Sequence, residues 1–115
     1  MQLGSIAASG LRAATTRLGV AAHNVANVST DGYQPARTVA LEERGGGVSA
    51  RVERPEVAGV GRVSGEHDAE AGSGSEVDLG GETVQEMLAQ RAFSANLAVL
   101  RTADEVASEL VRRRA

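Results

Sequence analysis

The residue types that could carry catalysis or ligand binding are few in this chain and lie far apart. The chain has no cysteine and no lysine, which excludes disulfides, thiolate ligands and Schiff-base chemistry. Its two histidines, His23 and His67, fall at the expected end of a helix and in a glycine-rich acidic segment. No nucleophile or second ligand stands at a useful spacing from either. We therefore predict no catalytic, cofactor-binding or metal-binding residues.

Other ligand classes find equally little support. The carboxylates around His67 are solvated and lack the spacing of a metal site. The glycine run 45–47 is not followed by lysine, which argues against a phosphate loop. The net charge is -3, and the basic run 112–114 suits a helix C-terminus, so we expect no nucleic-acid partner. No apolar run reaches the roughly 18 to 20 residues of a membrane span, and no cleaved secretory signal is expected at the N-terminus.

The first 28 residues carry apolar side chains at alternating steps of three and four, which predicts one helix over about residues 2–27. A thinner stripe of Ile6, Ala13 and Val20 lies about 100° around the same helix. One of these seams could face a partner within the chain and the other a neighbouring molecule. Glycines at 4, 10 and 19 each cost about 1 kcal/mol relative to alanine. We therefore expect this helix to be frayed, and the isolated chain to be largely unfolded or only partly helical.

The middle of the chain is short. Residues 29–32 stop the helix, and alternating apolar residues predict strands at 38–43 and 48–53 joined by a flexible tip. Residues 54–75 are rich in glycine and acidic residues and predict a linker. Asp78 is a good N-cap, with Ser75 in a capping-box-like start, for a helix that runs to about residue 113.

This last helix is apolar on two opposed faces and should be covered on both. One face carries Val84, Leu88, Ala92, Ala95, Val99, Ala103, Val106 and Leu110, and the other carries Phe93, Leu97, Leu100 and Val111. The predicted fold is mainly α, an antiparallel coiled-coil-like pair of terminal helices with a small β-hairpin and a flexible linker between them. The segments are 1–32 (helix and turn), 33–54 (hairpin), 55–76 (linker) and 77–115 (helix), with both helices in one domain.

Two segments carry a resemblance to a known family. Residues 22–33 read A-H-N-V-A-N-V-S-T-D-G-Y, which resembles the N-terminal signature of bacterial flagellar axial proteins, approximately A-N-N-I-A-N-x-x-T-P-G-Y. His23 replaces an asparagine, and Asp31 replaces a proline, which should let the helix end fray more. Residues 77–79 and parts of 86–105 are similar to the C-terminal signature of the same proteins. Gly80 and Gly81 stand where relatives favour helix formers, which predicts a weak first turn.

The resemblance implies a structural subunit of the flagellar basal-body rod. Such a subunit is not an enzyme and needs no cofactor. It leaves the cell by type III export without a cleaved signal, and its terminal helices pack with copies of itself and other rod subunits into a tubular shaft in the periplasm. The short insert between the signatures is typical of proximal rod proteins. Two alternatives remain: a small helical adaptor that binds one partner, such as an export-associated protein, and a secreted helical hairpin that dimerises.

The residues that we expect at subunit contacts are apolar seam positions and the two asparagines that continue the minor stripe of the first helix. Such asparagines fix register between subunits or simply cap the helix end. The contact residues are Leu11, Leu18, Asn24, Val25, Asn27, Val28, Leu88, Phe93, Leu97, Val99, Leu100 and Val106, and the signature turn comprises Thr30, Asp31, Gly32 and Tyr33.

Overall fold

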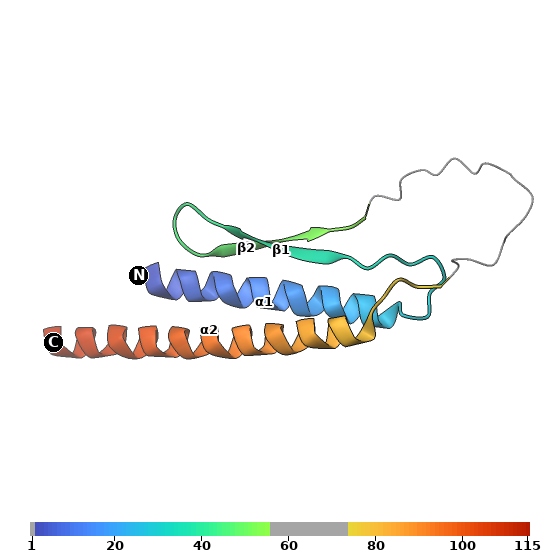
Figure 1. Cartoon of the computed structure of the whole chain (residues 1–115). Coiled ribbons are helices and arrows are strands. Elements are labelled where there is room, and N and C mark those ends of the chain that lie inside the picture. The colour runs from blue at the N-terminus through green and yellow to red at the C-terminus, as the bar shows by residue number, and fades with distance from the viewer. Residues whose placement is uncertain (1, 56–73) are drawn as a thin grey trace, which may run out of the picture.

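The computed structural model describes residues 2–55 and 74–115, and its elements follow the predicted order. Helix α1 spans Gln2–Ala26, strands β1 and β2 span Arg37–Glu42 and Val48–Glu53, and helix α2 spans Leu79–Arg114. The helices lie side by side in opposite directions, and the hairpin lies along α1 on the side away from α2 (Figure 1). The predicted mainly helical fold, with two long terminal helices and a small antiparallel hairpin between them, is therefore confirmed.

Helix α2 begins where the sequence places its cap. The Asp78 backbone is extended, and its carboxylate accepts a hydrogen bond from the backbone N–H of Gly80 at 3.1 Å. The first turn is helical through Gly80 and Gly81, the two glycines that predicted a weak start. A side chain at Gly81 would press on the Asp78 carboxylate at 2.9 Å, which gives this glycine a local role. The expected capping box is wrong, because Ser75 Oγ accepts from Val77 N instead.

The core is built from alanines. Ala7, Ala14 and Ala21 recur every seven residues on α1 and are at most 5% exposed, while Ala89 and Ala103 are the buried apolar residues of α2. Ala36, in the segment before β1, is the remaining buried apolar residue of the described chain. Small side chains let two helix backbones approach closely but bury little apolar area. The helix pair is therefore close-packed but has little hydrophobic stabilisation of its own.

Gly10 lies at a point of close approach between the helices. It lies against Asn96, midway between the buried alanines of α2, and a Cβ built on Gly10 would overlap the Asn96 carboxamide. Asn96 is held there by a hydrogen bond from its Nδ2 to the Ala92 carbonyl at 2.8 Å. Nearer the N-terminus, a Cβ built on Gly4 would lie 3.7 Å from Leu100 Cδ1, which is an ordinary contact distance. The glycines that lower helix propensity thus include one that the helix packing requires.

We expect Gly10→Ala and Gly19→Ala to have opposite effects on folding. Nothing lies within 4 Å of a Cβ at Gly19, so alanine there should stabilise the fold by up to about 1 kcal/mol through helix propensity. At Gly10 the same gain is outweighed, because Asn96 must turn away and lose its bond to Ala92, for a net cost of about 1 kcal/mol. The measurement is the concentration of trimethylamine oxide that induces helicity, followed by circular dichroism. Equal shifts for the two variants would contradict this packing.

The hairpin is fastened to α1 near its tip. Ser9, only 4% exposed, accepts a hydrogen bond from Val48 N at 3.0 Å and donates one to the Ile6 carbonyl at 2.7 Å. The chain turns between the strands with Gly46 and Gly47 at φ of 85° and 105°. Glu43 N donates to the Gly47 carbonyl at 3.2 Å, and Gly46 N donates to the Glu43 carbonyl at 2.9 Å, so two backbone hydrogen bonds close this turn.

The strand register separates the two apolar sets of the hairpin. Thr38 pairs with Val52 and Leu41 pairs with Ser49, so Val48, Ala50 and Val52 lie on the face opposite Val39 and Leu41. Leu41 remains 42% exposed. Most of the predicted linker 55–76, including His67, lies outside the described residues.

Candidate assembly site

Asn24 joins the end of α1, the segment before β1 and the start of α2. It is 1% exposed, and its carboxamide makes four hydrogen bonds. Nδ2 donates to the Ala36 carbonyl at 2.8 Å and to Glu82 Oε1 at 3.0 Å. Oδ1 accepts from the Tyr33 hydroxyl at 2.8 Å and from Ala36 N at 3.0 Å. A buried primary amide can satisfy about four bonds in all, so this one is fully used within the chain.

The signature turn lies beside this junction. Gly32 has φ of 70°, and Tyr33 N donates to the Thr30 carbonyl at 3.1 Å. Asn27 closes the helix end locally, since its Nδ2 donates to the His23 carbonyl and its Oδ1 accepts from Thr30 Oγ1. The Tyr33 ring stands edge-on to His23 at a centroid distance of 5.9 Å. The turn therefore aims the Tyr33 hydroxyl at Asn24, while Asp31 is exposed.

The two predicted asparagines have different surroundings. The side-chain polar atoms of Asn24 are all bonded inside the chain. Asn27 does take the local role at the helix end. Ala36 and Glu82 belong to the junction and were not predicted. The one sequence feature that pointed to Glu82 was its place in the first turn of α2, four residues after the N-cap. Its hydrogen-bond partner, Asn24, lies 58 residues away, and no local pattern links the two.

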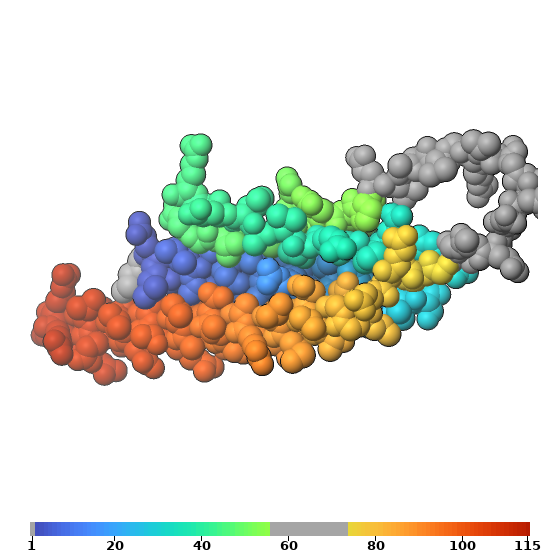
Figure 2. All heavy atoms as spheres, in the orientation of Figure 1, coloured from blue at the N-terminus to red at the C-terminus, as the bar shows by residue number. Residues whose placement is uncertain are grey.

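Helix α2 presents its bulky apolar residues outward. We call the exposed row along one flank of α2 the outer stripe; it consists of Val84, Leu88, Val99, Val106 and Leu110, which are 41 to 53% exposed. The buried Ala89 and Ala103 face α1 instead, so α1 packs between the two predicted apolar faces of α2 and covers neither fully. Figure 2 shows α2 open along one whole side of the molecule. Contiguous exposed apolar surface of this kind is typical of a binding interface.

The other predicted contact residues are divided between the helix seam and its edges. Leu18, 39% exposed, and Phe93, 40% exposed, line a hollow of about 320 Å³ between α1 and α2. The half-buried ones lie along or near the seam: Leu11, Val25, Val28, Leu97 and Leu100. The structure thus brings Leu18 and Phe93 together and leaves Leu88, Val99 and Val106 about half exposed.

Few of the described residues could take part in catalysis or metal binding. Among them, no three histidine, cysteine or acidic side chains gather as a metal site would require. His23 is exposed, and its ring stands edge-on to that of Tyr33. No helix of residues 2–55 and 74–115 is long and apolar enough to cross a membrane. What the fold displays instead is an alanine-cored helix pair with large apolar side chains on its outside.

Exposed apolar surface of this extent is typical of proteins that bind a partner. Comparison with protein families agrees at both ends of the chain. Residues 5–34 match the family described as flagella basal body rod protein, and residues 71–113 match the C-terminal family of the flagellar basal body rod proteins FlgEFG. The chain belongs to the flagellar basal body rod proteins, with a structural role in the basal body beside other rod components. A search of curated proteins found no match.

Proposed function

We propose that this chain is a wall subunit of the rod, and that it assembles through its two terminal helices into a tubular shaft that transmits torque. The observation that carries the proposal is that the small apolar side chains are buried and the large ones are exposed. Every buried apolar residue of the described chain is an alanine, whereas valine, leucine, methionine and phenylalanine side chains of α2 are exposed. A monomer gains nothing from that arrangement, but a tube wall with neighbours on both sides would bury those side chains.

The same feature fits export through a narrow channel. A core of alanines stabilises the monomer only weakly, and the first helix contains three glycines, so the chain should unfold readily for type III export and order when it reaches the growing rod. Its final location would be the periplasmic part of the basal body, reached without a cleaved signal. The short segment between the helices favours a proximal rod protein of the FlgC type over the distal rod and hook subunits.

The proposed contacts include both edges of the helix pair. Phe93 and Leu97 would meet one neighbour, while Leu88, Val99 and Val106 would meet another. The hairpin, on the opposite side of α1 from α2, would then lie toward the outside of the tube (Figure 1). Thr30, Asp31, Gly32 and Tyr33 would serve this assembly indirectly, because their turn holds Asn24 and with it the mutual position of the helices.

Electron microscopy of purified basal bodies tests the proposal. We expect cells that lack this chain to be immotile and to form no complete rod, and we expect a tagged copy to restore the rod and to be labelled within it. A complete rod in cells without the chain would contradict a wall subunit. Recovery of the chain in a small soluble complex of fixed stoichiometry, and not in the rod, would favour the adaptor.

A further inference from the structure

The C-terminal end of helix α2 extends beyond helix α1. Gly4 of α1 meets Leu100, Ala107 is half-buried, and residues 108–115 are all exposed. We call residues 108–115 the overhang, which extends past the N-terminus of α1 in Figure 1. It carries Leu110 and Val111, 53 and 70% exposed, next to the three arginines 112–114, against one carboxylate, Glu109. The overhang is thus an unpartnered helix end that is both apolar and basic.

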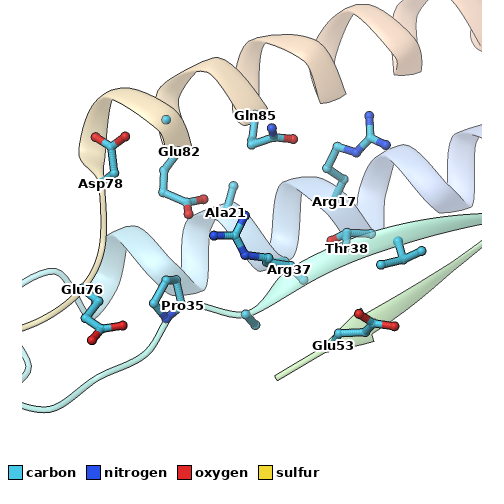
Figure 3. Close-up of a pocket in the computed structure, with 14 residues that line it drawn as sticks. Arg17, Ala21, Pro35, Arg37, Thr38, Glu53, Glu76, Asp78, Glu82 and Gln85 are labelled. Atoms are coloured by element: carbon cyan, nitrogen blue, oxygen red, sulfur yellow. The ribbon is translucent and has the colours of Figure 1, made fainter. Parts of the chain in front are cut away.

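A hollow of complementary character lies at the opposite end of the molecule. We call it the end hollow; it has a volume of about 350 Å³ and lies between the end of α1, β1 and the start of α2. Its floor includes Val20, Ala21, Pro35 and Val39. The charged residues that line it are four carboxylates, Glu53, Glu76, Asp78 and Glu82, and two arginines, Arg17 and Arg37 (Figure 3). Carboxylates therefore outnumber cations two to one around an apolar floor.

Asp78 and Glu82 are already hydrogen-bonded within the chain, to Gly80 N and to Asn24 Nδ2, so Glu53 and Glu76 are the carboxylates of the end hollow left for a new contact. The ion pairs of the described residues join Arg51 to Glu53 and Arg113 to Glu109, and all four side chains are about half exposed or more. Such pairs are worth little and exchange readily.

We propose that the overhang of one copy of this chain docks against the end hollow of a second copy. The arginines of the overhang would face Glu53 and Glu76 on the rim, and Leu110 and Val111 would cover the floor. The inference rests on the proposed assembly role and specifies which two surfaces meet. Because the two surfaces differ, the contact is heterologous, and repeating it gives an open row of subunits along the shaft and not a closed dimer.

Cysteine cross-linking tests this contact directly, because the chain contains no cysteine of its own. Gln85 lines the end hollow, and Val111 lies in the overhang. These positions are 26 residues apart on one straight helix, about 39 Å, far beyond the reach of a disulfide within one chain. Any disulfide in a variant with both Gln85→Cys and Val111→Cys therefore joins two molecules.

We expect basal bodies isolated from cells that carry this double variant to yield, on mild oxidation, products of two and more chain masses, whereas neither single variant yields any. Adding Arg112→Glu and Arg113→Glu should reduce the yield by on the order of tenfold. Mixing that chain with a second double-cysteine chain that carries Glu53→Arg and Glu76→Arg should restore the yield, because the opposite charges then meet again. Reversing Glu42 and Glu43, which do not line the end hollow, is the matched control and should change nothing.

Three outcomes would overturn the docking. A dimer of the Val111→Cys single variant would show that overhangs meet each other. A product whose mass is not a multiple of the chain mass would assign the overhang to a different rod protein. No product from the double variant, in cells with complete rods that contain it, would reject the contact while leaving the proposed function intact.

Discussion

Asn24→Asp is expected to destabilise the folded chain by about 3 to 5 kcal/mol and to abolish motility. The substitution keeps the shape of the side chain but replaces the two N–H donors with an oxygen. That oxygen would face the Ala36 carbonyl and the Glu82 carboxylate, which now accept from Asn24 at 2.8 and 3.0 Å. The site is 1% exposed, so the new charge is also desolvated and repelled by its neighbour. The measurement is the trimethylamine oxide concentration needed for folding, together with swimming in soft agar.

Two further variants show whether the loss arises at this junction. Adding Glu82→Gln to Asn24→Asp supplies an N–H donor opposite the new carboxylate and should recover about 1 to 2 kcal/mol. Asn27→Asp is the matched control, because the Asn27 amide donates locally to the His23 carbonyl and is exposed at the surface. It should cost at most about 1 kcal/mol. Similar losses at positions 24 and 27 would show that Asn24 is merely a helix-end residue.

The sequence predicts the elements of this fold well, because their signals are local. The seven-residue recurrence of Ala7, Ala14 and Ala21 is visible in the sequence and does mark the buried face of α1. Asp78 marks the start of α2 for a similarly local reason, since an N-cap bonds only to the next turn of its own helix. The hairpin follows from alternation on either side of a glycine run.

The side of α2 that faces α1 was harder to predict. Alanines make that contact, and the most hydrophobic residues of α2 do not mark it. Its bulkiest apolar residues form the strongest periodic signal, and yet Leu88 and Val99 are exposed while Ala89 and Ala103 are buried. A close helix approach selects small residues, so the most apolar face is left for other contacts. The junction at Asn24 escaped prediction for a different reason, since its four bonds join three segments that are distant in the sequence.

The outer stripe is expected to matter for assembly and not for the fold of the isolated chain. Leu88→Ala combined with Val99→Ala removes side chains that are 45 and 41% exposed, and alanine is also a better helix former, so the folding free energy should change by less than about 1 kcal/mol. If the stripe is buried between subunits, each truncation costs about 1 to 3 kcal/mol at every contact, and the rod should fail to form.

The readouts are the folding titration of the purified chain and counts of complete rods in basal bodies. Arg101→Ala serves as the control, because it truncates an exposed α2 residue that is not part of the stripe. The control should leave both readouts unchanged. Normal rods in the double variant would show that this row of valines and leucines stays exposed in the assembly. The placement of small apolar side chains in the core and large ones on the surface would then need another cause. Bulky apolar side chains that no neighbour covers would give the rod no stability.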